Sequence, residues 1–80
     1  MFLHLGGDFS VRVEEIISVL DYKFINETET GKTFMTDMKD RIDNVAGEKI
    51  KSVVVTDNKI YLSKLSPATL KKRVEELRNH

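Results

Sequence analysis

Alternating apolar and polar positions in the middle of the chain predict a β-hairpin. Two runs rich in β-branched and aromatic residues, 51–56 and 59–63, are separated only by Asp57-Asn58. A two-residue loop of this kind suits residues that tolerate positive φ. The expected cross-strand pairs are Thr56 with Lys59, Val55 with Ile60, Val54 with Tyr61 and Val53 with Leu62.

This register divides the hairpin into two faces, because successive strand residues point to opposite sides. The face that must contact the core carries Val53, Val55, Ile60 and Leu62. The other carries Ser52, Val54, Tyr61 and Ser63, and it is half apolar. Val54 and Tyr61 are therefore candidate interface residues, covered by another element or another subunit; one tolerated exposed tyrosine is the simpler alternative.

A helix is predicted directly after the hairpin. Ser66 is a good N-cap residue, and Pro67 suits the first helical position, where a missing N–H costs nothing. The apolar stripe of this helix is Leu70, Val74 and Leu77. Charged residues lie off the stripe: Lys71, Lys72, Glu75, Glu76 and Arg78.

The first half of the chain predicts three short strands and one helix. The strands are expected at Phe2–Leu5 (ended by Gly6-Gly7), 11–13 and 16–22, with a turn at Glu14-Glu15 and a polar loop at 26–30. Phe34, Met38, Ile42 and Val45 then recur at helical spacing, with the helix end bracketed by Asn44 and Gly47. The predicted fold class is α+β, mostly antiparallel, in the order β-β-β-α-β-β-α, as one domain over residues 1–80.

Length and composition point to a small cytoplasmic protein that associates with itself. A chain of 80 residues buries a modest share of its surface, and without cysteine neither disulfides nor cysteine-based zinc sites can compensate. Oligomerisation is a common way for so short a chain to gain stability. No apolar run is long enough for a membrane helix, and the start of the chain lacks the features of a signal peptide.

Zero net charge conceals a split between the two parts of the chain. Residues 1–48 carry five basic and ten acidic residues, a net of −5, whereas residues 49–80 carry eight basic and three acidic residues, a net of +5. Such asymmetry suits a polyanion or head-to-tail self-association, although an unevenly charged solvated surface would also account for it.

The sequence offers little for catalysis, so we expect no enzyme, no cofactor, no metal and no small-molecule substrate. Only His4 and His80 are histidines, and no Ser–His–Asp or Cys–His set can be assembled. Gly6-Gly7-Asp8 lacks the spacing of a phosphate-binding loop. The acidic trio Asp37, Asp40 and Asp43 lacks the pattern of a calcium loop and is typical of a solvated face.

Nucleic-acid binding fits the basic residues better. Lys49 and Lys51 precede the hairpin, and Lys71, Lys72 and Arg73 lie in the first turns of the last helix. Lysine-rich sets of this kind contact phosphate and give salt-dependent binding of low specificity.

Four segments resemble a known family. FLHLGG, EEIISVLD, KSVVVTDNKIYLSKLS and PATLKKR are similar to segments of the RemA/RemB family of bacterial extracellular-matrix (biofilm) regulators, closest to the RemB branch. The resemblance covers nearly the whole chain and is most specific in the hairpin and the helix after it. It implies a cytoplasmic, ring-forming, DNA-binding transcription regulator with a fold like the LytTR DNA-binding domain.

The resemblance also implies where DNA would be contacted. The basic positions before the hairpin fall on Glu48, Lys49 and Lys51, and the one at the start of the third strand falls on Glu15. Lys49 and Lys51, helped by Lys72 and Arg73, are thus the candidate DNA-binding residues. Acidic Glu15 and Glu48 would repel phosphate, so the alternative is an oligomeric scaffold or protein-interaction module of the same fold without DNA contact.

Overall fold

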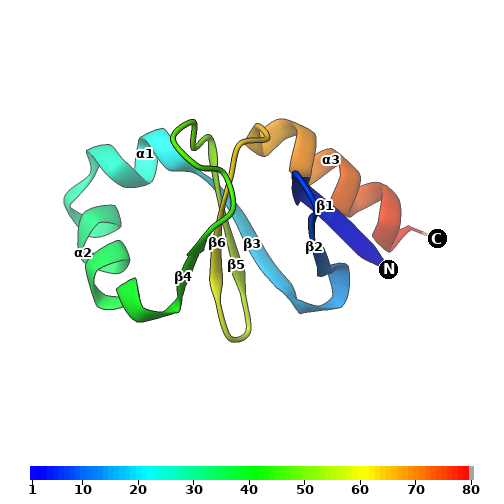
Figure 1. Cartoon of the computed structure of the whole chain (residues 1–80), viewed down its shortest axis with the longest axis horizontal. Helices are drawn as coiled ribbons and strands as arrows, with labels where there is room; N and C mark the ends of the chain where they lie inside the picture. The colour runs from blue at the N-terminus through cyan, green and yellow to red at the C-terminus, as the bar shows by residue number, and fades with distance from the viewer. Residues whose placement is uncertain (80) are drawn as a thin grey trace.

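The computed structural model describes residues 1–79, and His80 lies outside the described residues. A four-stranded sheet occupies the centre, with α1 and α2 on one face and β1, β2 and α3 on the other (Figure 1). The strands are β1 (Phe2–Gly6), β2 (Phe9–Arg12), β3 (Ile16–Asp21), β4 (Ile42–Asn44), β5 (Ser52–Thr56) and β6 (Ile60–Ser63). The helices are α1 (Tyr22–Glu27), α2 (Glu29–Asp37) and α3 (Pro67–Arg78), with 3-10 turns η1 (Val13–Glu15) and η2 (Lys39–Arg41). The predicted α+β class is confirmed.

The central sheet has the strand order β3-β5-β6-β4, and all its pairs are antiparallel except β4 with β6. The β5–β6 register is the predicted one, with Val54 opposite Tyr61 and Val55 opposite Ile60. The two loop residues tolerate positive φ but do not adopt it, since no non-glycine residue among 1–79 has positive φ. The turn closes through Thr56, whose N–H donates to the Lys59 carbonyl (2.9 Å) and whose Oγ1 accepts from the Lys59 N–H (3.1 Å).

Both faces of the central sheet are covered by the chain itself. Val53, Ile60 and Leu62 pack with Ile25 under α1 and α2, while Val54 packs on the opposite face. The core on that opposite face comprises Leu3, Leu5, Val11, Val13, Ile16, Val19, Val54, Leu70 and Val74, with Tyr61 packed against it. Val54 is fully buried there. Of the two covers expected for Val54, the structure shows another element of the same chain, since β1, β2 and α3 lie over it; as a surface for another subunit, the interface at Val54 is wrong.

Helix α3 begins and packs as predicted. The Ser66 Oγ accepts a hydrogen bond from the Thr69 N–H (3.2 Å), and Pro67 occupies the first turn. Leu70 and Val74 are buried against the sheet, and Leu77 is partly buried beside them. Such a cap contributes about 1 kcal/mol, so a single serine fixes where the helix starts.

The segment between β3 and β5 differs from the predicted one. The helix expected from Phe34 to Val45 ends at Asp37, and Ile42 lies instead in β4, paired in parallel with β6. The expected polar loop at 26–30 is the junction of α1 and α2, where Thr28 Oγ1 accepts from the Gly31 N–H (3.0 Å). Ile42 follows the helical spacing by coincidence, and its burial comes from pairing with a strand distant in sequence.

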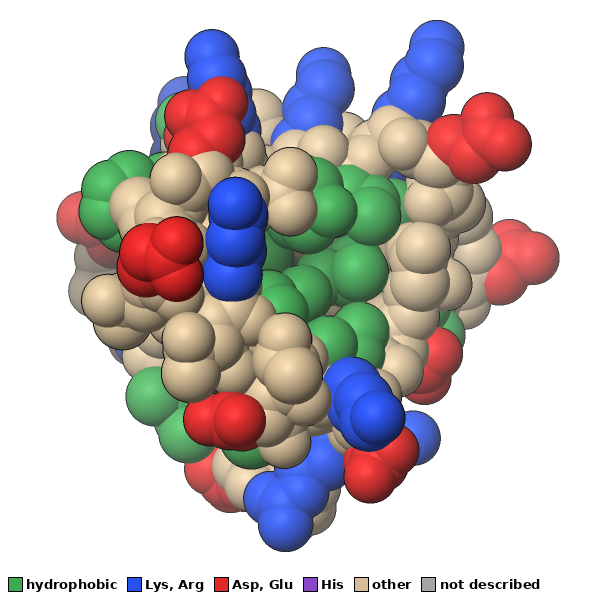
Figure 2. All heavy atoms as spheres, turned by 90° about the vertical axis from the view of Figure 1, so that its left-hand side faces the viewer, with side chains coloured by type: hydrophobic (Ala, Val, Ile, Leu, Met, Phe, Trp, Pro, Cys, Tyr) green, Lys and Arg blue, Asp and Glu red, His purple; other side chains and the backbone are tan. Residues whose placement is uncertain are grey.

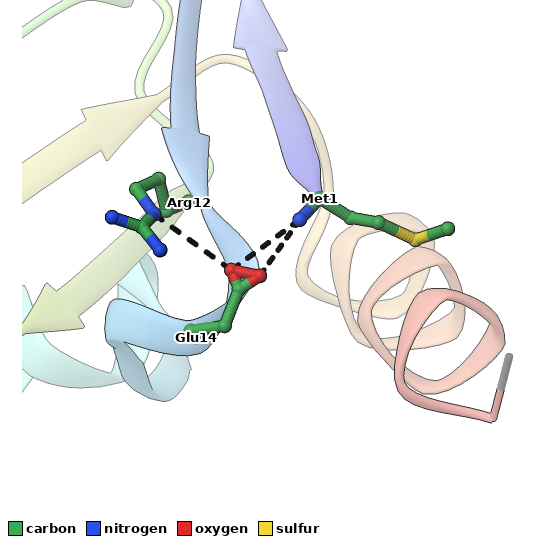
Figure 3. Close-up of polar contacts among 3 residues, drawn as sticks. All are labelled: Met1, Arg12 and Glu14. Atoms are coloured by element: carbon green, nitrogen blue, oxygen red, sulfur yellow. Dashed lines mark hydrogen bonds and ion pairs between the residues drawn. The ribbon is translucent and has the colours of Figure 1, made fainter.

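The β1–β2 hairpin is tied at its open end by the start of the chain. The Met1 carbonyl accepts from the Val13 N–H (2.8 Å), and the Met1 ammonium donates to the Glu14 carboxylate (2.7 Å). Arg12 Nε lies 3.8 Å from the same carboxylate (Figure 3). The hydrogen bond from the ammonium lowers the pKa of Glu14. These groups are about half exposed, so solvent screens the pairs and their contribution to stability is modest.

Candidate nucleic-acid interface

Four exposed lysines surround one end of the central sheet, where β3 and β6 end and β5 begins. We call this set the basic rim: Lys23, Lys49, Lys51 and Lys64. Figure 2 shows basic side chains projecting from this edge of the molecule, at the top of the view. None of the ion pairs found within residues 1–79 involves a rim lysine. The rim ammonium groups are therefore available to an external anion.

The loop that carries Lys49 is organised by one asparagine. Asn44 Oδ1 accepts from the N–H groups of Ala46 (2.9 Å) and Gly47 (3.1 Å), and Asn44 Nδ2 donates to the Gly47 carbonyl (3.0 Å). Gly47 has a φ of +73°, which a residue with a side chain rarely adopts. The loop is thus held in one conformation, which limits the entropy lost when Lys49 contacts a ligand.

Lys51 is fixed more firmly than Lys49, because its backbone joins three elements. Its N–H donates to the Ser63 carbonyl (2.8 Å), and its own carbonyl accepts from the Tyr22 N–H (3.0 Å). The same residue lines a shallow hollow with Lys23 and with Pro67 at the start of α3. The exposed Lys51 side chain therefore projects from a well-anchored backbone.

Lys64 and Lys23 are rim residues that sequence reasoning missed. The aliphatic part of Lys64 lies over Gly6, so close that a Cβ added to this glycine would stand 3.1 Å from the Lys64 Cε. Lys64 follows Ser63, the residue paired with Ser52, so it stands beside Lys51 across the β5–β6 pair. That pairing was predicted, so the position of Lys64 could have been inferred from the hairpin register; the position of Lys23 required the β3–β5 pairing.

The other two candidate residues, Lys72 and Arg73, are exposed on α3 but lie apart from the rim. Lys72 is about 7.5 Å along the helix axis from Pro67 at 1.5 Å per residue. Arg73 lines a different hollow, with Phe2, His4 and Glu76. The structure thus places Lys49 and Lys51 together in the basic rim, whereas Lys72 and Arg73 lie on α3 outside it.

The two acidic residues at expected DNA-contact positions lie at opposite ends of the sheet. Glu48 is exposed next to Lys49, within the rim loop. Glu15 lies in η1, before the start of β3, whereas the rim lies beyond the end of β3 at Asp21. Asp21 lies five residue steps along the strand from Ile16, about 17 Å at 3.3 Å per residue. Of these two residues, Glu48 alone is placed to repel an anion bound at the rim, where Asp21 adds a second carboxylate beside Lys23 and Lys51.

Tyr61 lies near the Glu15 end, away from the rim. Its ring packs on Phe9 with the ring centroids 5.0 Å apart. Burial raises the pKa of Tyr61, and the nearby carboxylates of Asp43 and Glu15 raise it further. The phenol therefore stays neutral at physiological pH and serves the packing between β6 and β2.

Two other kinds of feature are absent from the described part of the chain. Residues 1–79 hold no group of three or more histidine, cysteine or carboxylate side chains that could bind a metal ion. No helix within them is long and apolar enough to cross a membrane.

The sequence matches the family model described as RemA-like, extracellular matrix regulatory protein A-like, over residues 2–74. The chain belongs to this family. It is also 37% identical over 75 residues to extracellular matrix regulatory protein B of Bacillus subtilis (strain 168), covering 94% of this chain and 91% of that protein. The resemblance noted from sequence is thus confirmed. In this RemA-like chain the matched region includes all four rim lysines and the first eight residues of α3.

Proposed function

We propose that this RemA-like chain regulates the expression of extracellular-matrix (biofilm) genes in the cytoplasm by binding DNA through its basic rim. The observation that carries the proposal is the gathering of Lys49 and Lys51 with Lys23 and Lys64 at one end of the sheet. The family match and the name of the Bacillus relative support the regulatory role. The action is non-enzymatic and requires no cofactor.

The rim binds phosphate rather than reading bases. Lysine ammonium groups are flexible point charges, and they lack the bidentate geometry by which arginine recognises guanine. Binding by one subunit is therefore weak and depends on salt. Self-association, with a closed ring as one form, multiplies these contacts through avidity. Lys72 and Arg73 extend the contact where DNA passes along α3.

A polarisation titration of a labelled duplex against salt concentration tests the proposal. Each phosphate contact contributes about 0.9 to the slope of log affinity against log salt. Lys49→Glu with Lys51→Glu removes two contacts, so the slope should fall by about 1.8 as affinity drops. The matched control is Lys32→Glu with Lys39→Glu, the same charge change at exposed positions on α2 and η2. Equal losses in both double variants, or no binding by the parent protein at low salt, would overturn the proposal.

One observation favours a second function. Glu48 places a carboxylate beside Lys49 in the same loop, where it opposes phosphate. An oligomeric scaffold or protein-interaction module that has kept the fold but lost DNA contact would tolerate this residue. Absence of DNA binding together with stable self-association would identify that function.

A further inference from the structure

The shallow hollow beside Lys51 lies within the basic rim and has a mostly apolar lining. Tyr22, at the start of α1, and Pro67, at the start of α3, line it together with Ile50, just before β5. The ammonium-bearing side chains of Lys23 and Lys51 belong to the same hollow. Figure 1 shows the starts of α1 and α3 on either side of the upper end of the sheet. An apolar recess is thus framed by positive charge.

The walls of this hollow are held in place by hydrogen bonds and by packing. The Tyr22 N–H donates to the Lys51 carbonyl (3.0 Å), which joins α1 to the start of β5. On the other side, the Ser66 Oγ accepts from the Thr69 N–H (3.2 Å) and fixes the start of α3. Tyr22 and Ile50 also pack against the core under α1 and α2. A recess formed in advance loses little conformational entropy when a ligand binds.

Tyr22 offers an aromatic ring that has no ring partner. The chain has two tyrosines, and Tyr61 already packs on Phe9; within residues 1–79 no such ring pair includes Tyr22. An aromatic ring beside basic side chains is the usual arrangement for binding unpaired nucleotides, since the base stacks on the ring and the cations neutralise the phosphate. The hollow has a volume of about 270 Å³. That volume equals about nine water molecules at about 30 Å³ each, which is room for one base and not for a base pair.

The carboxylate of Asp21 favours a nucleotide over a plain phosphate. Asp21 lines the hollow, and its Oδ1 accepts from the Lys23 N–H (2.9 Å). A carboxylate beside Lys23 and Lys51 opposes phosphate, but it accepts a hydrogen bond from the exocyclic amino group of adenine, cytosine or guanine. An unpaired base presents the edge that carries this amino group, whereas base pairing occupies that edge in a double helix.

We propose that this hollow binds one unpaired nucleotide, with its base stacked on Tyr22, its amino group at Asp21 and its phosphate on Lys23 and Lys51. A single-stranded nucleic acid and a free nucleotide both present this chemistry. The proposal rests on the basic rim of the proposed function and deepens it, because it assigns a base to a surface that otherwise contacts only phosphate. Since Lys51 belongs to both sites, a nucleotide in the hollow and a duplex on the rim compete.

Replacement of the ring tests the stacking. Tyr22→Leu keeps an apolar side chain against the core but removes the ring, and it should weaken the binding of labelled single-stranded oligo(dA) about fivefold or more in a low-salt polarisation titration. Tyr22→Phe keeps the ring and should restore most of the affinity. The matched control is Phe24→Leu, which removes a ring from the same helix at a position that is 65% exposed and outside the hollow.

Circular dichroism checks that these variants fold. Equal affinity of Tyr22→Leu and the parent protein for oligo(dA), or equal losses in Tyr22→Leu and Phe24→Leu, would overturn the inference.

Small ligands test the base itself, in the parent protein and without any substitution. AMP, UMP and inorganic tripolyphosphate are titrated separately into isotope-labelled protein and followed by NMR. AMP should move the ring-proton signals of Tyr22 by stacking, UMP should bind more weakly because uracil has no amino group, and tripolyphosphate should leave those signals in place. Tyr22 signals that AMP moves no further than tripolyphosphate does would contradict the site. Tighter binding of oligo(dA) than of AMP identifies a strand as the ligand, and equal binding identifies a free nucleotide; both support a base in the hollow.

The inference and the proposed function fail separately. Duplex binding that depends on Lys49 and Lys51, together with single-strand binding that does not depend on Tyr22, refutes only the hollow. Single-strand binding that depends on Tyr22, in a protein that does not bind duplex DNA, refutes only the proposed role of the rim.

Discussion

The hydroxyl of Ser63 donates a hydrogen bond of 2.6 Å to the carbonyl of Leu5, although 58 residues separate them. The bond joins the end of β6 to the end of β1 and so links the central sheet to the two-stranded one. Ser63 is fully buried, and its Oγ also accepts from the Leu65 N–H (3.1 Å). Its cross-strand neighbour Ser52 donates to the Leu65 carbonyl, so two small hydroxyls hold together three segments.

Replacing Ser63 by alanine should therefore destabilise the fold. It removes two hydrogen bonds and leaves the Leu5 carbonyl without this donor in a buried setting, which costs about 1–3 kcal/mol. Urea unfolding followed by circular dichroism measures the change in the free energy of unfolding. Thr36→Ala, on the exposed face of α2, is the control and should change it by less than about 0.5 kcal/mol. Equal stabilities for the two variants would contradict the role of Ser63.

Gly31→Ala should be unfavourable although it raises helix propensity. A Cβ at Gly31 would overlap the carbonyl group of Ile25, so α1 and α2 must move apart. Forced overpacking of this sort costs about 1–3 kcal/mol. Thermal unfolding measures it, with Thr30→Ala as the neighbouring control at an exposed position. A melting temperature as high as that of the parent protein would show that the helix junction is loosely packed.

Neutralising the two acidic residues should have unequal effects on DNA binding. Glu48→Gln removes a negative charge that repels phosphate next to Lys49 and should raise affinity by a factor of about 1.4 to 5, the value of an exposed charge pair of about 0.2–1 kcal/mol. Glu15→Gln should change affinity little, since Glu15 lies at the other end of β3. Titrations at one low salt concentration compare them directly. A larger gain from Glu15→Gln would place the DNA at the opposite end of the sheet.

Glu14 should make stability depend on acid pH. The hydrogen bond from the Met1 ammonium lowers the folded-state pKa of Glu14 below its ordinary value of 4.5. A lowered folded-state pKa stabilises the fold fully above the unfolded pKa, and that stabilisation is lost as pH falls through the folded-state value. The urea midpoint of the parent protein should therefore exceed that of Glu14→Gln at pH 6–7, and the difference should shrink below about pH 4.5. A difference that does not change with pH would show that the carboxylate is not paired in solution.

Local signals were sufficient for the second half of the fold. The β5–β6 register and the start of α3 follow from residues adjacent in sequence: two β-rich runs around Asp57-Asn58, and the cap at Ser66-Pro67. The hairpin register and the helix start each depend on residues within about ten positions of one another. A single short segment therefore contains all the interactions that determine each of them. The rim positions of Lys49 and Lys51 followed from the same segment.

Non-local pairing explains what sequence reasoning missed. Nothing near Ile42 shows that it pairs in parallel with Ile60, so its helical spacing was misleading. The sequence left open whether another element or another subunit covers Val54, because its cover comes from β1 and α3, at the two ends of the chain. The starts of α1 and α2 could have been predicted from sequence, because Asp21 and Thr28 are favourable N-cap residues. The side chain of each accepts the hydrogen bond expected at a helix start.

The arrangement of the two cores bears on how the protein is made in the cell. The core under α1 and α2 draws on residues from 20 to 62, so it can form before α3 has left the ribosome. The core that contains Leu3 and Leu5 also needs Leu70 and Val74, and it cannot close until α3 has emerged from the ribosome. During that interval β1 and β2 have no α3 to pack against, which leaves an apolar hairpin exposed to chaperones and proteases. The last step in folding this chain is therefore the packing of α3, which covers its first two strands.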